Sequence, residues 1–333
     1  MATIQAVVFP KADAYEVREL TLAEPGPGDI VVRTLVTAIS PGTERWILRG
    51  KHLGTRFPCV PGYHRLGVVE SCGAEVKGHA VGDLVYGSGN RWQESDVVSM
   101  WGAHVSRSVS APGGYRNYGP AAAMSREAME RLAFTILCGV SNRGVNRAEI
   151  QAGQRTLHLG AGIVGHCAAQ LARRRGALPM VIDRDPERIA FVSARMPAIP
   201  VVNLDDPDLE AKLKAFAPNG FDVLQDTVGH AATTDRLVPL VRAQGTLLLQ
   251  AQYFDRQTCA LDLDQIKVRE LTVKTTCGIR EEDWAQTAPL LISGELAMSA
   301  LITHRLPAAR LLEGYGMLHT GTPHSIGIVI HWD

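Results

Sequence analysis

The pattern of hydrophobic and polar residues divides the chain into two regions. Over roughly the first 120 residues, short apolar runs such as QAVVFP, DIVVRTLVTAIS and DLVYGSG are bounded by Gly, Pro and Asp. Runs of this kind predict the strands of a compact β-rich domain. After about residue 140, apolar runs of strand length alternate with stretches of helical periodicity, and this alternation predicts a parallel α/β sheet. The expected fold class is therefore α/β.

The elements predicted for the second region follow one another closely. Strands are expected at residues 155–162, 178–185, 221–229, 245–252 and 271–278, and helices at residues 163–177, 186–196, 231–244 and 281–296. A succession of strands and helices in this order is typical of a doubly wound parallel sheet.

The composition is that of an ordinary globular protein. Of 333 residues, 46% are hydrophobic, and 34 basic side chains balance 34 acidic ones, which disfavours nucleic acid as a partner and favours a small-molecule substrate. A chain of this length exceeds one typical core, so two domains are expected. No stretch reaches the roughly 18 apolar residues of a membrane span, and the N-terminus lacks the pattern of a signal peptide, so a cytoplasmic protein is expected.

A glycine-rich motif, Gly160-Ala-Gly-Ile-Val-Gly165, follows one of the predicted strands and opens a predicted helix. In dinucleotide-binding turns of this kind the first glycine permits the tight turn, the second lets the backbone approach the pyrophosphate, and the third allows helix and strand to pack closely. The candidate cofactor-binding residues of this turn are Gly160, Gly162, Ile163, Val164 and Gly165.

The next predicted strand ends at Asp183, where a carboxylate would accept hydrogen bonds from the hydroxyl groups of the adenosine ribose. This carboxylate would repel the 2′-phosphate of NADP, so NAD is the expected cofactor. Arg184 follows directly and could instead bind such a phosphate. Asp183 could also only cap the turn that follows the strand.

Stretches along most of the chain resemble the medium-chain dehydrogenase/reductase superfamily, among them GDIVVRTLVTAIS-PGTE, VPGYHRLGVVESCG, AGQRTLHLGAGIVG and AQGTLLL. The resemblance implies a GroES-like β-rich catalytic domain at residues 1–139 and 278–333, and a Rossmann dinucleotide-binding domain at residues 140–277. It also implies a homodimer through the edge of the Rossmann sheet, which the stretch DLDQIKVRELTVKTT would provide.

Within that superfamily, the stretches AISPGTERWILRGKH, VPGYHRLGVV and WGAHVSRSV, together with residues 300–333, are most similar to the bacteriochlorophyllide a 3-hydroxyethyl dehydrogenases. This resemblance implies NAD-dependent oxidation of a secondary alcohol on a tetrapyrrole side chain to a ketone. Members of that group tend to read Gly-Tyr-Glu where this chain reads Gly62-Tyr63-His64. The substrate is therefore left open between a tetrapyrrole hydroxyethyl group, another secondary alcohol and a polyol.

The metal ligands of zinc-dependent members are replaced here. The resemblance places Pro41 at the first cysteine ligand and Tyr63 at the histidine ligand, and neither proline nor a neutral phenol binds zinc well. Cys138 lies near the region of the third ligand. The stretch from about residue 90 to about residue 115 also lacks the cysteines of a structural zinc lobe. The sequence therefore predicts a protein without zinc.

Without a metal ion, other groups must stabilise the substrate oxygen and move its proton. Thr43 matches the superfamily position whose hydroxyl begins the proton relay, although it could equally be a turn residue. Tyr63 stands where the metal would be bound, so its hydroxyl is expected to reach the substrate oxygen. His64 is a candidate proton acceptor because an imidazole exchanges protons near neutral pH.

Glu44 is a further catalytic candidate, either as a base or as the partner of Arg45 or Arg65 in a structural ion pair, and the second reading is favoured. His52 and His104 lie on predicted loops, and surface positions are expected for both.

Two tryptophans, Trp92 and Trp101, lie in the polar segment 86–119 and are the candidate substrate-binding residues, because aromatic side chains on loops often line pockets. The function expected is a zinc-independent, NAD-dependent interconversion of a secondary alcohol and a ketone. The alternatives are an NADPH-dependent quinone or enoyl reductase, which Asp183 and the segment Ser40-Pro-Gly-Thr-Glu44 disfavour, and a nucleotide-binding protein without catalysis.

Overall fold

The structure is a computed structural model that describes residues 2–254, 259–321 and 325–333. It divides into two compact units. The first joins the chain up to Phe134 with the segment from Ile302 to the C-terminus, and the second runs from Thr135 to Leu301. The first boundary expected from the sequence, 139/140, lies close to the observed one after Phe134. The second, 277/278, lies well before the observed one after Leu301.

The first unit is built around a mostly antiparallel sheet with strand order β16-β17-β3-β5-β6-β9, and β8 also pairs with β3. Its strands are β3 (Ile30–Ile39), β5 (Arg65–Cys72), β6 (Asp83–Tyr86), β8 (Arg107–Ser110), β9 (Arg116–Pro120), β16 (Ile302–Pro307) and β17 (Gly327–His331). Two smaller sheets pair β1 (Thr3–Val8) with β2 (Glu16–Thr21) and β4 (Cys59–Val60) with β7 (Val98–Ser99).

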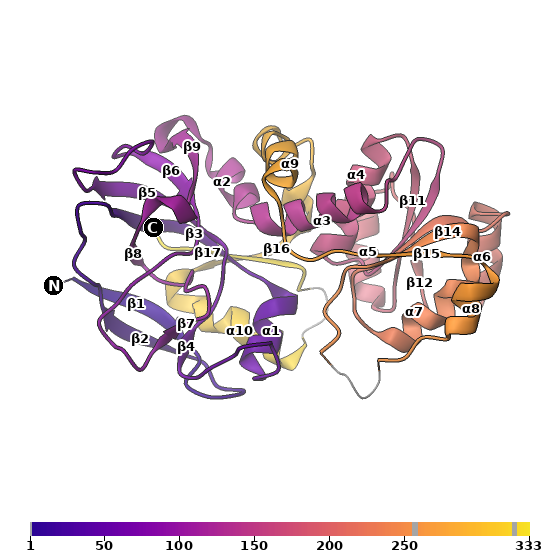
Figure 1. Cartoon of the computed structure of the whole chain (residues 1–333), viewed down its shortest axis with the longest axis horizontal. Helices are drawn as coiled ribbons and strands as arrows, with labels where there is room; N and C mark the ends of the chain where they lie inside the picture. Colours follow the sequence, from indigo (N-terminus) through magenta and orange to yellow (C-terminus); the bar gives the residue numbers. More distant parts are fainter. Residues whose placement is uncertain (1, 255–258, 322–324) are drawn as a thin grey trace. The chain divides into compact units, whose positions relative to one another are not determined.

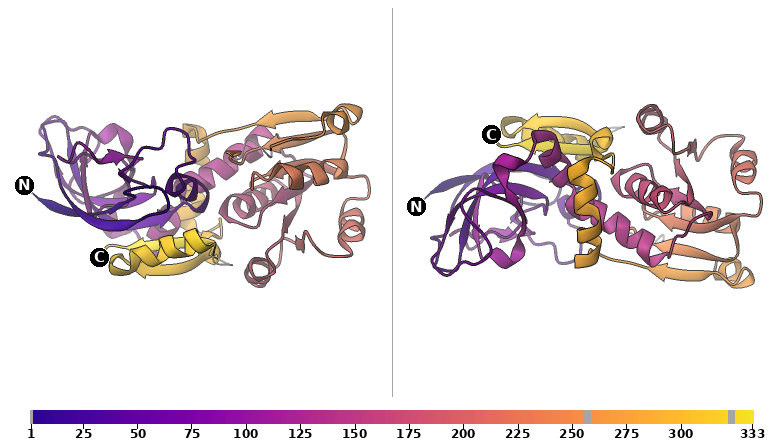
Figure 2. Two further views of the ribbon diagram at one scale, coloured as in Figure 1. Left: turned by 90° about the horizontal axis from the view of Figure 1, so that it is seen from below. Right: turned by 90° about the horizontal axis from the view of Figure 1, so that it is seen from above.

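Helices α1 (Pro41–Leu48), α2 (Arg126–Leu132) and α10 (Leu311–Thr320) complete this unit. The two views of Figure 2 show the C-terminal segment, in yellow, beside the early strands, in indigo, because β17 pairs antiparallel with β3. Proline suits the first position of a helix, since its fixed φ is already helical and its missing N–H would be unpaired there. The helix α1 accordingly starts at Pro41, with Ser40 as its N-cap residue.

The second unit contains a parallel sheet with strand order β12-β11-β10-β13-β14-β15, and helices cover both of its faces (Figure 1). The strands are β10 (Arg155–Leu159), β11 (Leu178–Asp183), β12 (Val201–Asn203), β13 (Phe221–Asp226), β14 (Val241–Leu249) and β15 (Thr272–Thr275). The helices are α3 (Thr135–Arg147), α4 (Ile163–Arg174), α5 (Pro186–Arg195), α6 (Leu209–Phe216), α7 (Ala231–Leu237), α8 (Leu263–Val268) and α9 (Glu281–Ser293).

This arrangement is the Rossmann type of doubly wound sheet, so the α/β fold class expected from the sequence is confirmed. The strand order reverses beside β10, which has β11 on one side and β13 on the other. In open parallel sheets, ligands bind at the carboxyl ends of the strands at such a reversal. The fold thus directs attention to the ends of β10, β11 and β13.

The helix α9 belongs to the second unit because it packs against α3. A Cβ on Gly139 of α3 would lie 2.0 Å from Cδ1 of Ile279, so glycine permits the close approach. Asn146 of α3 also donates a hydrogen bond to Asp283 of α9 at 2.9 Å. These contacts place the end of the second unit after α9, rather than at residue 277.

The predicted helix at residues 231–244 is too long. The helix α7 ends at Leu237, a short 3-10 turn follows from Val238 to Leu240, and β14 already begins at Val241. Pro239 lies in that turn and cannot donate the backbone hydrogen bond that a continuing helix would need. The apolar residues Val238 and Leu240 therefore pack as a turn against the core of this unit.

Candidate active site

The glycine-rich turn after β10 has the geometry that a dinucleotide requires. Gly160 has a φ of +105°, which residues with a side chain rarely adopt. A Cβ on Gly165 would lie 1.9 Å from the carbonyl oxygen of Gly160, so only glycine lets α4 start this close to the strand. An added Cβ on Gly162, by contrast, would meet no atom within 4 Å. The turn is therefore open at Gly162, the position at which the backbone approaches a pyrophosphate in such folds.

The helix that follows the turn presents its N-terminus without a side-chain cap. Gly162 is the N-cap residue of α4, and Ile163 and Val164 form the first turn of the helix. Backbone N–H groups and the helix dipole at such an N-terminus favour a bound anion. The residues predicted to bind the cofactor through this motif thus lie together in one turn, and they fit the pyrophosphate of a dinucleotide.

Asp183 lies at the end of β11 beside the same turn, with 6% of its surface exposed. Its Oδ2 accepts a hydrogen bond of 2.7 Å from the N–H of Ala161, and its Oδ1 accepts one of 2.9 Å from the N–H of Asp185. Asp183 therefore holds the glycine-rich turn against β11. It also caps the turn that follows, which is the alternative that the sequence left open.

The cation next to Asp183 is Arg188 rather than Arg184. Arg188 lies in the first turn of α5, and its Nη1 is 3.2 Å from Oδ2 of Asp183. Arg184 is exposed. The sequence analysis missed Arg188, although its place in the first turn of a helix that begins directly after a strand-end carboxylate was the available signal.

The end of β13 approaches the glycine-rich turn from the other side. A Cβ on Gly160 would lie 2.8 Å from Cγ2 of Val228 and 2.9 Å from Oγ1 of Thr227. Val228 is 52% exposed, which is unusual for a large apolar residue beside a core strand. The sequence analysis did not single out these two residues. Their position after the strand next to β10, at the reversal of strand order, could have identified them.

In the first unit, three hydroxyl groups meet where β3 ends and β5 begins. The Oη of Tyr63 lies 2.5 Å from Oγ of Ser40 and 3.4 Å from Oγ1 of Thr43. Ser40 and Thr43 come from the N-terminus of α1, whereas Tyr63 lies just before β5, with His64 between them. We call Ser40, Thr43 and Tyr63 the hydroxyl cluster. Of these, Ser40 was not predicted from the sequence.

Burial raises the pKa of Tyr63 to about 12, although its hydrogen bonds with Ser40 and Thr43 oppose the shift. The phenol is therefore neutral near pH 7. A neutral phenol can donate its proton in a hydrogen bond to a substrate oxygen, while the hydroxyls of Ser40 and Thr43 accept or donate in turn.

His64 contacts the ring of Tyr63, with ring centroids 4.3 Å apart, but it does not join the hydroxyl cluster. Its side chain is fully buried, its Nδ1 lies 2.7 Å from Oη of Tyr86, and its Nε2 has no hydrogen-bond partner among the described residues. Burial holds the pKa of His64 well below its usual range, and His104 lowers it further. The imidazole is thus neutral at pH 7, and no direct hydrogen bond leads from the cluster to it.

Glu44 is fully buried in a polar network that adjoins the hydroxyl cluster at Ser40. Its Oε1 accepts a hydrogen bond of 2.7 Å from the N–H of Ser40, and its Oε2 accepts one of 2.6 Å from Oη of Tyr315 and lies 3.1 Å from Nε2 of His104. The arginine partner expected from the sequence is therefore wrong, because the groups that reach Glu44 are a backbone amide, a phenol and an imidazole. This carboxylate holds the start of α1 in place.

His104 is also misplaced by the sequence analysis, which expected it at the surface. Its side chain is fully buried, and its Nδ1 lies 3.0 Å from Oγ1 of Thr37. The reason is the backbone at Gly62, where a Cβ would lie 2.2 Å from Cδ2 of His104. Only glycine at residue 62 leaves room for the imidazole. His52, in contrast, is partly exposed on a loop.

The hydroxyl cluster does not supply the donor set of a zinc ion. Zinc in proteins is bound by thiolates, imidazoles and carboxylates, whereas this position offers three hydroxyl groups, one of them a phenol with a raised pKa. The nearest carboxylate, Glu44, is engaged by its own network. Cys138 lies in the other unit, buried with its Sγ 3.8 Å from Sγ of Cys167. The residues at this position therefore do not fit a catalytic zinc.

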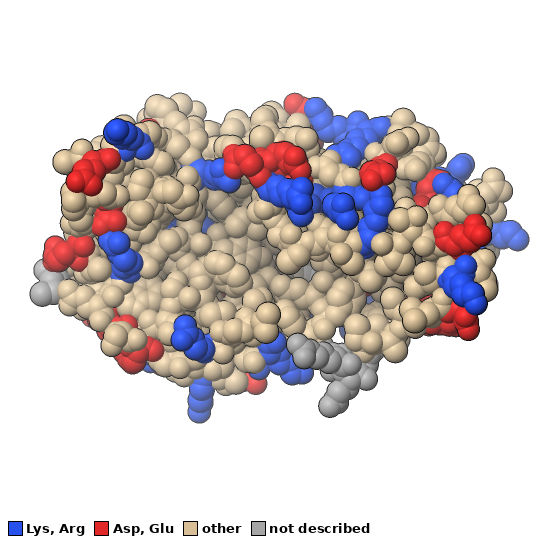
Figure 3. Space-filling view, in the orientation of Figure 1, with Lys and Arg blue, Asp and Glu red and all other residues tan. Residues whose placement is uncertain are grey.

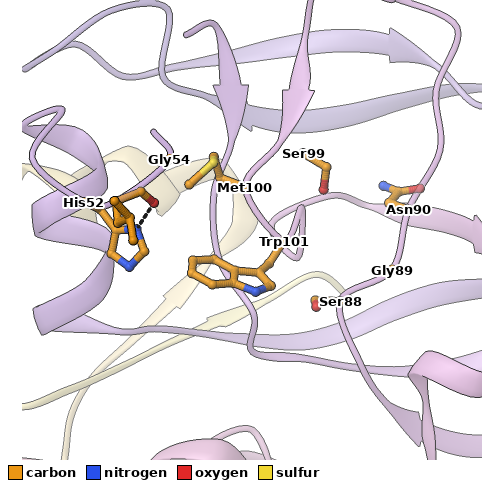
Figure 4. Close-up of a pocket in the computed structure, with 9 residues that line it drawn as sticks. His52, Gly54, Ser88, Gly89, Asn90, Ser99, Met100 and Trp101 are labelled. Carbon is orange, nitrogen blue, oxygen red and sulfur yellow. Dashed lines mark hydrogen bonds between the residues drawn. The ribbon is translucent and has the colours of Figure 1, made fainter. Parts of the chain in front are cut away.

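A pocket of about 560 Å³ opens on the first unit next to the hydroxyl cluster. Trp101 connects the two, because its ring lies edge-on to that of Tyr63 with centroids 5.5 Å apart. Figure 4 shows the indole of Trp101 between His52 on one side and Ser99 and Asn90 on the other. The lining residues are His52, Leu53, Gly54, Ser88, Gly89, Asn90, Ser99, Met100 and Trp101.

The two candidate substrate-binding tryptophans are placed differently. Trp101 lines the pocket and is 42% exposed. Trp92 packs against the apolar core around β1 and β2, and its Nε1 donates a hydrogen bond of 2.7 Å to the carbonyl oxygen of Val97. Trp92 is not among the residues that line this pocket, and these contacts join it to the core of the first unit.

Two family models match the chain. The first, described as alcohol dehydrogenase GroES-like domain, matches residues 26–126, and the second, described as zinc-binding dehydrogenase, matches residues 164–293. The first match contains the hydroxyl cluster, and the second contains Val164, Gly165 and Asp183. The chain belongs to the medium-chain dehydrogenase/reductase superfamily. It is accordingly an oxidoreductase of the alcohol dehydrogenase type.

Relatives in the superfamily cover nearly the whole chain. The 2-desacetyl-2-hydroxyethyl bacteriochlorophyllide A dehydrogenase of Rhodobacter capsulatus is 28% identical over 98% of both chains. The L-galactonate-5-dehydrogenase of Escherichia coli is 24% identical over 95% of both chains. The resemblance to the bacteriochlorophyllide enzymes noted in the sequence is thus found again by direct comparison.

Solved structures of the superfamily share the fold. A Sinorhizobium meliloti protein described as a zinc-binding dehydrogenase and bound to NADP matches all of this chain with a TM-score of 0.82 and 20% identity. An Escherichia coli alcohol dehydrogenase in complex with NADH matches with a TM-score of 0.83 and 16% identity, again over both whole chains. In its described part, the chain has no helix with the length and apolarity needed to cross a bilayer.

Proposed function

We propose that this protein is a zinc-independent, NAD-dependent oxidoreductase that interconverts a secondary alcohol and a ketone by hydride transfer. The observation that carries the proposal is the hydroxyl cluster of Ser40, Thr43 and Tyr63, which occupies the position where the superfamily resemblance implies a metal ion. A dehydrogenase must stabilise negative charge on the substrate oxygen when hydride leaves or arrives. Hydroxyl donors at this position serve that purpose without a metal.

The nicotinamide cofactor is supported by the turn between β10 and α4. The open space at Gly162 and the uncapped N-terminus of α4 suit a pyrophosphate, and the structural neighbours from S. meliloti and E. coli bind NADP and NADH. NAD is proposed over NADP because the carboxylate of Asp183 stands at the end of β11, where it would repel a 2′-phosphate. When bound, the cofactor accepts or returns the hydride.

The hydroxyl cluster would then act on the substrate oxygen. Tyr63 donates a hydrogen bond to that oxygen in the ketone and passes it a proton as the alcohol forms. Ser40, 2.5 Å from the phenol, and Thr43, 3.4 Å from it, relay a proton from solvent water to Tyr63, and each hydroxyl receives one proton as it passes one on. In the reverse direction the same hydroxyls carry the proton away from the alcohol. His64 is not needed for this route, because its imidazole bonds to Tyr86.

The remaining proposals concern assembly and location. We propose a homodimer formed through β15, the edge strand of the parallel sheet, where Val273 is 43% exposed. An exposed edge strand with an apolar side chain can pair with a second copy of itself. We also propose that the protein works in the cytoplasm. A secondary alcohol on a tetrapyrrole or on a polyol fits the proposed reaction, as the names of the R. capsulatus and E. coli relatives suggest.

The variant Asp183→Ser tests the choice of cofactor. We expect it to weaken NAD binding by about 1–3 kcal/mol, because charge-assisted hydrogen bonds to the ribose are lost. NADP binding should stay unchanged or improve, and it serves as the internal control for damage to the glycine-rich turn. Calorimetric titration of both cofactors into both proteins measures the effect. Tighter binding of NADP than of NAD by the wild-type protein would show that the assignment is wrong.

A further inference from the structure

The segment that forms one side of the pocket carries only basic charges. Between Glu44 and Glu70 the chain has five basic residues and no acidic residue, namely Arg45, Arg49, Lys51, Arg56 and Arg65. Elsewhere, on the face shown in Figure 3, basic and acidic side chains lie among one another. Within residues 2–254, 259–321 and 325–333, no salt bridge joins any of the five to a carboxylate.

The loop after α1 brings this charge to the pocket. His52, Leu53 and Gly54 line the pocket, and they are flanked by the exposed cations Lys51 and Arg56. None of the nine lining residues is acidic. The pocket wall contains no anion, and Lys51 and Arg56 adjoin its lining residues in the chain, which favours a positive local potential that attracts anionic ligands.

Arg65 adds a cation directly behind the opposite wall. Its side chain is fully buried, with Nη2 donating a 2.6 Å hydrogen bond to the carbonyl oxygen of Gly89 and Nη1 donating a 3.3 Å bond to that of Gly102. Gly89 lines the pocket, and Gly102 follows the lining residue Trp101. A buried guanidinium that lacks a carboxylate partner is costly, and the two carbonyl dipoles, with the hydroxyl and ring of Tyr115, compensate it only in part. Because the guanidinium of Arg65 contacts Gly89, which lines the pocket, its positive electrostatic field extends into the pocket.

The backbone at Trp101 shows that this wall is held in a special shape. Trp101 has a φ of +69°, a conformation that is unfavourable for a bulky residue. Such strain persists where surrounding contacts enforce it, and it is found most often at binding sites. Here the hydrogen bond from Arg65 to Gly102 fixes the turn that presents the indole to the pocket. The same arginine thus positions the apolar wall and supplies charge behind it.

We propose that the substrate of this protein is a secondary alcohol that also carries a carboxylate, held in the pocket between Trp101 and the basic segment 45–56. Its apolar part packs against the indole and the exposed side chain of Leu53, which is 77% exposed. Its hydroxyl group faces Tyr63, whose ring contacts Trp101. The hydroxyl part of this inference rests on the proposed dehydrogenase function, whereas the carboxylate part rests on the pocket alone.

A matched pair of probes tests the inference: 4-hydroxypentanoate and 4-hydroxypentanamide have the same shape and differ in charge. Binding is followed by tryptophan fluorescence, with Trp101→Phe as the control that assigns the signal to the pocket. We expect the wild-type protein to bind the carboxylate at least about tenfold more tightly than the amide, the size of effect that one partly screened charge produces. Added salt should reduce this preference.

The double variant Lys51→Gln/Arg56→Gln should lose most of the preference, and Arg65→Met should lose part of it. Arg18→Gln, which removes a surface cation paired with Glu16 on β2, should keep the preference in full. If Arg65→Met does not fold, the double variant decides. Equal binding of the two probes, failure of both to bind, or an unchanged preference in the double variant contradicts the proposal.

The formation of reduced nicotinamide from the same two probes, measured with NAD, separates this inference from the proposed function. Tight carboxylate binding without oxidation would contradict the proposed function and leave the anion site standing. Oxidation of both probes with the same kcat/KM would support the function and contradict the preference for a carboxylate.

Discussion

The variant Tyr63→Phe is expected to lose about 100-fold in kcat while its affinity for NAD stays the same. Removing one donor that stabilises an oxyanion typically lowers kcat by about 10²–10³-fold. Tyr63 lies in the first unit, whereas the turn proposed to bind the cofactor lies in the second, so NAD binding should not change. Steady-state kinetics and calorimetry on the same preparation measure the two quantities.

A matched control is available in Tyr86→Phe. Tyr86 is also a buried tyrosine of the first unit, and its Oη lies 2.7 Å from Nδ1 of His64. We expect this variant to keep kcat within about threefold of the wild type, since it removes no group that reaches the substrate oxygen. A large loss in Tyr86→Phe together with normal activity in Tyr63→Phe would transfer the proton route to His64.

The stability of the second unit is expected to fall steeply between about pH 6.5 and about pH 4. Burial lowers the pKa of both His158 and His166 from 6.5 to about 4. In this window the unfolded chain binds more protons than the folded one, so the free energy of unfolding rises with pH. The stability that the folded protein gains from keeping these two histidines neutral is complete above about pH 6.5 and is lost as the pH falls towards 4. From pH 7 to pH 5 the two histidines should together remove about 4 kcal/mol.

The two imidazoles are held differently, which allows a sharp test. Both ring nitrogens of His166 lack a hydrogen-bond partner among the described residues, whereas His158 bonds to Thr156 and Gln225. His166→Leu should therefore fold at pH 7 and show a loss between pH 7 and pH 5 that is about 2 kcal/mol smaller. Urea denaturation at the two pH values measures this, with the exposed His319→Gln as the control. An unchanged pH dependence in His166→Leu would contradict the account.

The parts of the site that depend on local sequence could be predicted. The spacing of Gly160, Gly162 and Gly165 predicts the turn after β10, because each glycine has a steric reason that acts within a few residues. Asp183 is likewise found from its place at the end of a strand. Arg188 was missed because its contact with Asp183 depends on how the first turn of α5 reaches back to β11.

The parts that depend on contacts across the chain could not be predicted. Ser40 meets Tyr63 only because β3 pairs with β5 in a register that places Thr37 opposite Arg65. The burial of His104 depends on the absence of a Cβ at Gly62, and its partner Glu44 also bonds to Tyr315 near the other end of the chain. The segment Pro41–Glu44 could be read from sequence as a tight turn, yet in the fold it begins the helix α1.

The central claim is that this dehydrogenase works without zinc, and the metal content of the active protein tests it most directly. Zinc per chain is determined by elemental analysis on the sample whose oxidation of a secondary alcohol is assayed with NAD, before and after treatment with a chelator. The account predicts well under one zinc per chain and an unchanged rate after chelation, because the hydroxyl cluster is proposed to stabilise the substrate oxygen in place of a metal ion. One zinc per chain, with activity that chelation removes and added zinc restores, would contradict it.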